Sequence, residues 1–198
     1  MEYILVAVDD TMKTAWEEFF SNESNVTIVI GDITKVVVDA IVSPANSFGF
    51  MDGGVDYAIS ERLGWDLHER LQQQIKELPE GELLIGRALV MDTNDKDIPY
   101  LITAPTMRVP MKFNIATSVN AYLAAKAAII AAKNHPQIQT VAFTGMCTGI
   151  GKMKPQTSAL QMYQAFLEIE KKQKLDFEDF VAAQKQQISL NPDGMIFD

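Results

Sequence analysis

Short apolar runs alternate with amphipathic stretches along the chain. Runs rich in β-branched and aromatic residues predict strands at 3–8, 26–30, 36–42, 88–91, 100–104 and 140–144. Apolar residues at helical spacing predict helices at 14–20, 55–63, 66–78, 115–133 and 155–172. The alternation predicts an α/β fold, and the almost uniformly apolar run at 36–42 predicts a strand covered on both faces.

The length of the chain, 198 residues, fits one domain with a short appendage. We expect this domain to span 1–172, with 1–25 as its first strand and helix, and a C-terminal extension to span 173–198. The extension is acidic but carries Phe177, Phe180 and Val181, through which we expect it to dock. A turn is predicted at 191–194, where the sequence is Asn-Pro-Asp-Gly.

The charge balance is strongly acidic. The chain has 17 Lys and Arg against 26 Asp and Glu, a formal net charge of −9 and a pI of about 4.7. Such a chain has no global field that attracts a polyphosphate backbone, so we do not expect nonspecific nucleic-acid binding. An anionic ligand would have to bind through local backbone N–H donors.

Cysteine and histidine are scarce. One cysteine, Cys147, and two histidines, His68 and His135, allow no internal disulfide and are too few for a metal-ligand cluster. The acidic Glu2 follows Met1, where a signal peptide would have a basic start, so we expect no signal peptide. No apolar run approaches the ~18 residues of a membrane helix, so we expect no membrane span. The sequence predicts a cytoplasmic protein without metal or cofactor and leaves its oligomeric state open.

A glycine-bearing loop at 46–56 follows the third predicted strand, and Gly53 and Gly54 stand at the start of a predicted helix. In α/β sheets, ligands bind beyond the carboxyl ends of the strands. Backbone N–H groups at a glycine-rich helix start, together with the helix dipole, suit a diphosphate. The alternative is a plain loop in which Asp56 only stabilises the first helical turn.

A second glycine-rich turn, 145–152, follows the last predicted strand. It departs from a Walker A loop, because one residue too many separates its first and last glycines and Met153 stands where Ser or Thr is required. It can instead form an anion cradle from the Thr148 hydroxyl and the N–H groups of 149–151. Two cradles at adjacent strand ends predict a ligand with two phosphates.

Cys147 lies between two glycines of this turn, with the spacing of a nucleophile elbow. A cysteine hydrolase needs a histidine beside the thiol. His135 precedes the strand that Cys147 follows, so the length of the strand separates them. His68 falls in a predicted helix, where a half-exposed structural position is the ordinary interpretation. This alternative therefore lacks an assigned base.

An acid also follows the strand at 26–30, in the sequence Gly31-Asp32-Ile33-Thr34. An acid at a strand end can accept a hydrogen bond from an exocyclic amine or a sugar hydroxyl. Asp32 or Thr34 can equally close a turn. Both interpretations remain open on this motif alone.

Together, four ordered blocks resemble those of the macrodomain family: Gly-Asp-Ile-Thr-Lys at 31–35, Val-Asp-Ala-Ile-Val-Ser-Pro-Ala-Asn at 38–46, Gly-Gly-Val-Asp at 53–56 and Thr-Gly-Ile-Gly at 148–151. The resemblance extends over about residues 26–170 and is most like the stand-alone macrodomains of bacteria and their phages. It implies that 1–172 form a three-layer α/β/α fold with a mixed, mostly parallel sheet and a cleft that binds ADP-ribose.

The resemblance also implies roles for single residues. Asp32 would hold the adenine amine with the Ile33 backbone beside it, and Asn46 would contact the distal ribose. Asp56, ten positions after Asn46, would orient the water that attacks the anomeric carbon. We expect the helix dipole to favour its carboxylate form and the nearby diphosphate charge to disfavour it, so that Asp56 orients a water by hydrogen bonding and is not a strong base. The diphosphate would lie between Gly53, Gly54 and Val55 on one side and Thr148, Gly149, Ile150 and Gly151 on the other.

Two functions follow from the resemblance. One is a metal-independent hydrolase that removes ADP-ribose from a modified target or deacylates O-acyl-ADP-ribose, with Asn46 and Asp56 as catalytic residues. The other is a non-catalytic reader of ADP-ribose, NAD-derived nucleotides or ADP-ribosylated protein. The loops depart from the family pattern at several positions: Ser43 and Pro44 replace Asn and Ala, Met51 and Asp52 interrupt a glycine stretch, and Gly151 replaces a Phe or Tyr.

Overall fold

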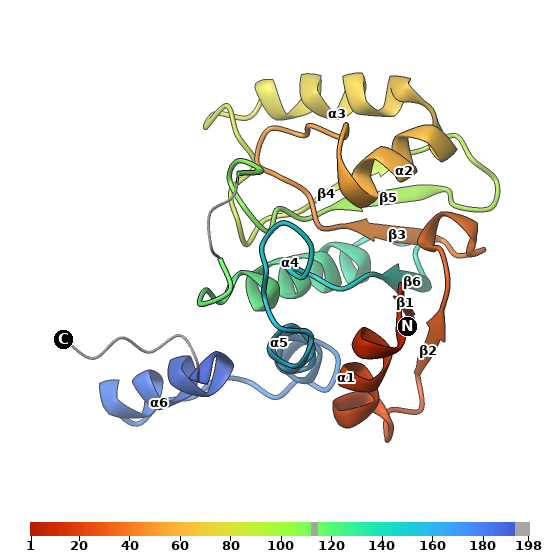
Figure 1. Ribbon diagram of the computed structural model, residues 1–198. Coiled ribbons are helices and arrows are strands. Elements are labelled where there is room, and N and C mark those ends of the chain that lie inside the picture. The colour runs from red at the N-terminus through yellow and green to blue at the C-terminus, as the bar shows by residue number, and fades with distance from the viewer. Residues whose placement is uncertain (112–114, 193–198) are drawn as a thin grey trace.

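The computed structural model describes residues 1–111 and 115–192. Its centre is a six-stranded sheet with the strand order β2-β1-β6-β3-β5-β4 (Figure 1). The strands are β1 (Glu2–Ala7), β2 (Val26–Ile30), β3 (Ala40–Ser43), β4 (Leu89–Asp92), β5 (Tyr100–Thr103) and β6 (Thr140–Phe143). All pairings are parallel except that of β4, which runs antiparallel to β5. The predicted α/β fold with a mixed, mostly parallel sheet is confirmed.

Helices cover both faces of the sheet (Figure 1). One face carries α1 (Asp10–Phe20), α4 (Asn120–Asn134) and α5 (Pro155–Ile169), and the other carries α2 (Gly54–Leu63) and α3 (Trp65–Lys76). Successive strand residues point to opposite faces, so Val42 packs into the first core and Ile41 into the second. This is why the central strands are apolar at nearly every position.

Strand β3 is shorter than the apolar run predicts. The predicted strand at 36–42 is wrong at its start, because a 3-10 helix, η1 (Ile33–Lys35), precedes an extended connection and β3 begins only at Ala40. The Val38 N–H donates to the Asp97 carbonyl, and the Asp39 carboxylate accepts from the N–H of Thr140 at 2.8 Å. Both contacts lie outside the strand ladder and hold the chain in place before the strand begins.

Helix α4 begins five residues later than its composition predicts. The Ser118 hydroxyl oxygen accepts a hydrogen bond from the Asn120 N–H, at 3.2 Å, and Ser118 and Val119 stand before the first helical residue. Residues 112–114 lie outside the described residues. No helix in the described part of the chain is long and apolar enough to cross a membrane.

The C-terminal extension contains a helix, α6 (Phe180–Leu190), that projects from the body beside α5 (Figure 1). The expected docking through its aromatic side chains is wrong, because Phe180 is 76% exposed. Its buried end anchors it instead. Leu190 is buried, and the Asn191 side-chain amide donates to the carbonyls of Ala116 and Ser118 at 2.7 and 3.1 Å. The predicted turn at 191–194 lies partly outside the described residues.

Candidate functional site

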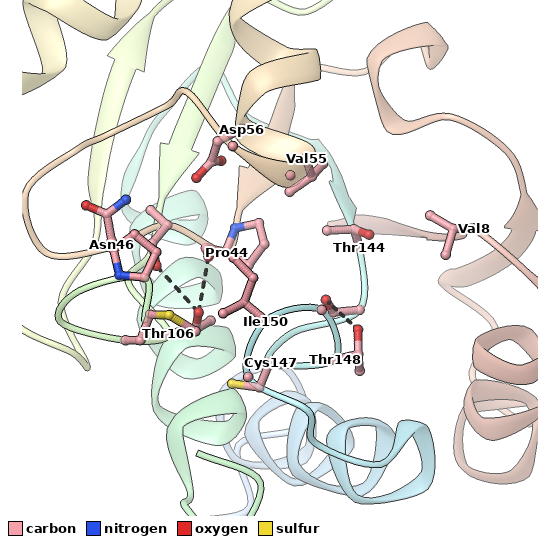
Figure 2. A pocket seen from close by; sticks show the side chains of 18 of the residues that line it. Val8, Pro44, Asn46, Val55, Asp56, Thr106, Thr144, Cys147, Thr148 and Ile150 are labelled. Atoms are coloured by element: carbon pink, nitrogen blue, oxygen red, sulfur yellow. Dashed lines mark hydrogen bonds between the residues drawn. The ribbon is translucent and has the colours of Figure 1, made fainter. Parts of the chain in front are cut away.

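A cleft of about 400 Å³ opens at the carboxyl edge of the sheet, where β1, β3, β5 and β6 end. Figure 2 shows Val55 and Asp56 on one side of it and Ile150, Cys147 and Thr148 on the other. The residues that line it from the predicted set are Asn46, Gly53, Gly54, Val55, Asp56, Thr148, Gly149, Ile150 and Gly151. The structure therefore brings the two predicted glycine loops together across one cleft.

Asn46 shapes the first loop. Its side-chain oxygen accepts hydrogen bonds from the N–H groups of Phe48 and Phe50, at 3.1 and 3.2 Å, and its Nδ2 donates to the Phe50 carbonyl at 2.8 Å. The side chain is buried, and one N–H of its amide remains beyond these three bonds. Asn46 therefore holds the loop that forms the cleft wall, and it has at most one donor left for a ligand.

Helices α2 and α3 fix the middle of the same loop at Met51. The Ser60 hydroxyl donates to the Met51 carbonyl at 2.9 Å, and the Met51 N–H donates to Nδ1 of His68 at 3.3 Å. His68 therefore accepts a backbone hydrogen bond from the loop, which is a structural role. Both backbone polar groups of Met51 are satisfied, so the loop approaches the start of α2 in a defined conformation.

Gly54 makes the turn from this loop into α2 possible. Its φ is +59°, in the left-handed region that L-residues with a Cβ adopt at a cost. No side chain caps the first turn of α2, so its first N–H groups point toward the cleft without an intramolecular partner of that kind. The start of α2 is therefore suited to an anion.

Asp56 lies in that first turn and is 7% exposed. Its Oδ1 accepts a hydrogen bond from the Ser43 hydroxyl. Burial raises the pKa of this carboxyl to about 6, the Ser43 hydrogen bond opposes the rise, and the charge of Asp52 adds to it. Desolvation is the largest of these effects, so the pKa of the carboxyl rises although its place at a helix start favours the carboxylate.

Helix α5 contacts the second glycine loop and fixes part of its backbone. The Ser158 hydroxyl donates to the Met146 carbonyl at 2.6 Å, and the Met153 N–H donates to the Cys147 carbonyl at 3.0 Å. Gly151 sits so close to its surroundings that an added Cβ would lie 2.6 Å from the Cys147 carbonyl oxygen. No side chain larger than hydrogen fits at this position, which explains why an aromatic residue is absent from it.

Among the described residues, no histidine or cation activates the Cys147 thiol, and a hydrogen bond with Thr106 lowers its pKa by less than burial raises it. The thiol is buried, and burial raises its pKa to about 12, so it is protonated near neutral pH. His68 is engaged with Met51, and the His135 ring lies 4.4 Å from that of Tyr100, at the opposite end of β5 from the cleft. The structure gives the cysteine-hydrolase alternative no base.

Positive side chains are missing from the lining of the cleft. Among the described residues that line it there is no Lys, Arg or His, whereas three carboxylates, those of Asp9, Asp52 and Asp56, are present. Asp9 caps α1 by accepting from the Met12 N–H at 3.0 Å. No group of three or more His, Cys, Asp and Glu side chains in the described residues could hold a metal ion. Donors for an anion must therefore come from backbone N–H groups and from uncharged side chains of the lining such as Thr148.

Asp32 and Ile33 lie outside the residues that line the cleft. Asp32 caps η1, accepting from the N–H and the hydroxyl of Thr34 at 3.0 and 2.7 Å, and these bonds lower the pKa of its carboxyl. Ile33 is buried in the core beneath α2 and α3. The turn interpretation of Asp32 describes its contacts in this structure, while its exposed carboxylate remains accessible to a ligand.

Sequence reasoning missed a group of lining residues that follow other strands. Val8 and Asp9 come after β1, Thr106 and Met107 come after β5, and Thr144 comes after β6. The Thr106 hydroxyl donates to the Pro44 carbonyl at 3.1 Å and joins two of these strand ends (Figure 2). The signal was available, because the rule that ligands bind at carboxyl strand ends applies to every parallel strand.

Comparison with known proteins shows the family. The family model described as Macro domain matches residues 42–162, and the chain belongs to this family. An uncharacterized protein of Aquifex aeolicus is 31% identical over 148 residues, which are 75% of this chain and 84% of that protein. A protein of Escherichia fergusonii named O-acetyl-ADP-ribose deacetylase is 38% identical over 68 residues, 34% of this chain and 37% of its own length.

Solved structures agree with the fold. The Oceanobacillus iheyensis macrodomain with ADP has a TM-score of 0.62 and 19% identity, covering 83% of this chain and 86% of its own. Other structures of that macrodomain carry single substitutions of an Asn, a Gly and an Asp. In that chain the Gly follows the Asn by seven positions, and the Asp follows the Gly by three. The three-layer arrangement implied by the sequence resemblance is the arrangement of this fold.

Proposed function

We propose that the cleft binds ADP-ribose and that the protein is a metal-independent hydrolase, which removes ADP-ribose from a modified target or deacylates O-acyl-ADP-ribose. The observation that carries the proposal is Asp56, a buried carboxyl on the wall of an open cleft beside an uncapped helix start. The relative named O-acetyl-ADP-ribose deacetylase and the solved macrodomain with ADP support it. Asn46, Gly53 and Asp56 also have the seven-and-three spacing of the substituted residues in the solved macrodomain.

In the proposed complex, backbone N–H groups hold the diphosphate. Those of Gly53, Gly54 and Val55 lie on one side, and those of Thr148, Gly149, Ile150 and Gly151 lie on the other. Such donors compensate for the absence of cationic side chains in the lining. Asn46 contributes its remaining amide N–H to the distal ribose. Asp32 would accept from the adenine amine, with the Ile33 backbone beside it.

Asp56 orients the attacking water in the proposed reaction. With a pKa of about 6, the carboxyl is mainly ionised at pH 7 and can accept a proton as well as position the water. For a carboxylate-linked target, the water oxygen bonds to the anomeric carbon while the bond to the target oxygen breaks. The water proton passes to Asp56, and the target leaves as a carboxylate. For an acyl ester the same water attacks the carbonyl carbon and its proton passes to Asp56. The bond from that carbon to the ribose oxygen then breaks, and the ribose oxygen leaves with the proton from Asp56, which gives the free acid and ADP-ribose.

Calorimetry and turnover together test this proposal. We expect ADP-ribose to bind at one site per chain and much more tightly than AMP, because the cleft offers two loops for two phosphates. We expect turnover of O-acetyl-ADP-ribose or of Asp- and Glu-linked ADP-ribose. Asp56→Asn should reduce turnover ~100-fold and leave the affinity for ADP-ribose within a few-fold of wild type. Asp10→Asn is the matched control, since it changes an exposed first-turn carboxyl, that of α1, outside the cleft lining.

The reader function is the second candidate, and one observation favours it. Gly151 stands where an aromatic side chain packs on the distal ribose in many family members, and the Cys147 carbonyl and Ile115 exclude such a side chain here. A less confined ribose is held less well for reaction. Tight ADP-ribose binding without turnover on any of the substrates above would establish the reader and exclude the hydrolase.

A further inference from the structure

Ser43 is the last residue of β3 and is fully buried. It lies on the same face of the strand as Ile41, which packs beneath α2 and α3. Its hydroxyl donates to Oδ1 of Asp56, and this is the side-chain hydrogen bond that the described structure gives to that carboxyl. A strand residue outside the cleft lining therefore contacts the carboxyl on which the proposed reaction depends.

The backbone around Ser43 is fixed. Its carbonyl accepts from the Ala104 N–H at 3.0 Å, and β3 is paired on both sides, with β5 and with β6. The Asp56 side chain, in contrast, has two rotatable bonds and projects from the first turn of a helix. A hydrogen bond from an immobile hydroxyl restricts which way the carboxylate plane faces. It also leaves the second carboxylate oxygen unused by Ser43.

We propose, on the basis of the function proposed above, that Ser43 is a positioning residue whose hydroxyl orients the Asp56 carboxylate so that Oδ2 is presented to the attacking water. The Ser43 hydroxyl uses one acceptor site on Oδ1 and leaves both acceptor sites of Oδ2 for the water. Positioning of this kind affects the chemical step more than ligand affinity. Ser43 itself does not touch the ligand.

The same hydrogen bond favours the charged form of Asp56. It opposes the burial that raises the pKa of the carboxyl, so loss of the hydroxyl should raise this pKa further. Asp52, in the loop before α2, is the charged group that acts on Asp56. The other titratable groups of the cleft lining are Asp9 and Cys147.

The elements packed against α2 carry further titratable groups. On η1, the Lys35 ammonium lies 3.5 Å from the Asp32 carboxylate, and on α3, Nδ1 of His68 accepts from Met51. Strand β3 presents the uncharged Ser43 beneath α2. These surroundings are unchanged when the Ser43 hydroxyl is removed, so a change in the pKa of Asp56 reports the lost hydrogen bond.

Thr103 supplies a matched control one strand away. It pairs directly with Ser43 across β3 and β5, so its side chain lies on the same face of the sheet. It is fully buried, and its hydroxyl has no hydrogen-bond partner among the described residues. Thr103→Val removes a hydroxyl at constant shape from the same buried layer, without removing a bond to Asp56.

Two measurements on the full chain test Ser43→Ala. The first is an NMR titration of the carboxyl carbon of Asp56 in the free protein, where we expect the pKa to rise by about one pH unit. The second is turnover, where we expect kcat to fall ~10- to 100-fold, the acid limb of the pH profile to move upward, and KM and the affinity for ADP-ribose to change less than about twofold. Thr103→Val should leave all of these as in wild type.

Several outcomes overturn the proposal. An unchanged Asp56 pKa in folded Ser43→Ala does so, and so does an equal fall in kcat for Thr103→Val. If Ser43→Ala does not fold, Ser43→Cys keeps a weaker donor in the same place and should shift the pKa and kcat in the same directions by less. A wild-type protein without turnover refutes the proposed hydrolase, yet the titration still decides whether Ser43 controls Asp56.

Discussion

At the scale of single residues, burial of the Asp56 carboxyl lowers the free energy of unfolding where that carboxyl is charged. Its carboxyl has a pKa of about 6 in the folded chain, against an ordinary value of 3.8. Between about pH 4 and pH 6 the folded chain therefore keeps a proton that the unfolded chain has released. The free energy of unfolding therefore falls as the pH rises through this window. At higher pH this carboxyl causes no further decrease.

Replacement of this carboxyl should therefore stabilise the fold at alkaline pH. We expect Asp56→Asn to raise the free energy of unfolding at pH 8 by on the order of 2 kcal/mol, because the variant no longer buries a charge. At pH 4 the gain should be small. Thermal unfolding at both pH values measures the difference, with Asp10→Asn as the control for an exposed carboxyl in the first turn of a helix. An equal change in Tm at the two pH values would contradict the burial of a charged Asp56.

The two glycines before Asp56 should respond differently to the same substitution. An added Cβ meets nothing within 4 Å at either position, but only Gly54 has a positive φ, +59°. Gly54→Ala should lower the free energy of unfolding by ~1–2 kcal/mol through backbone strain alone. Gly53→Ala should leave it within ~0.5 kcal/mol and weaken ADP-ribose binding, because its methyl group enters the cleft. Chemical denaturation and calorimetry on both variants separate strain from steric exclusion.

At the scale of elements, the C-terminal extension depends on its buried end and not on its exposed aromatic residues. Asn191 donates to two carbonyls near the start of α4, and Gln161 of α5 donates to the Leu190 carbonyl at 3.1 Å. Asn191→Ala should lower the free energy of unfolding by ~1–2 kcal/mol, because two half-buried carbonyls lose a donor. Ser189→Ala is the control, since the Ser189 hydroxyl bonds only within α6. Equal Tm values for the two variants would show that the anchor is dispensable.

Sequence reasoning succeeded for elements with a strong local pattern. Apart from the start of β3, the strands and helices around the two glycine loops lie close to where periodicity placed them. Strand order could not follow from periodicity, because pairing is a tertiary property. The exposed Phe180 shows the limit for the extension, since apolar composition does not tell which partner is within reach. The start of β3 was misplaced because the side chain of Asp39 bonds across the sheet to Thr140, a hundred positions away.

The candidate site could be predicted from the sequence only in part, because a motif shows the position of a loop and not its surroundings. Glycine spacing and strand ends identified both loops, but the pKa of Asp56 depends on burial beneath the loop and on Ser43, neither of which a motif encodes. Val8 and Thr106 were missed because they carry no recognisable motif, although their position after parallel strands indicates the cleft.

At the scale of the whole molecule, the charge of the chain and the proposed ligand have the same sign. The net charge is −9, and the described lining of the cleft contains carboxylates but no Lys, Arg or His. Long-range electrostatics should therefore disfavour a diphosphate, and binding should rest on backbone N–H groups at short range. Donors of this kind are screened little by salt, whereas the repulsion from distant charges is screened strongly.

This balance predicts how ADP-ribose affinity depends on ionic strength. From about 50 mM to about 500 mM NaCl, we expect Kd to stay within about twofold or to decrease slightly, as screening removes the repulsion of the net charge. Asp52→Lys is the informative variant, because it places one cation on the rim and should bind more tightly at low salt and lose that gain at high salt. Calorimetry on both proteins at the two salt concentrations makes the comparison. A severalfold loss of wild-type affinity at high salt would mean that a cation outside the lining contributes, and Lys152, the last residue of the second loop, would be the residue to replace next.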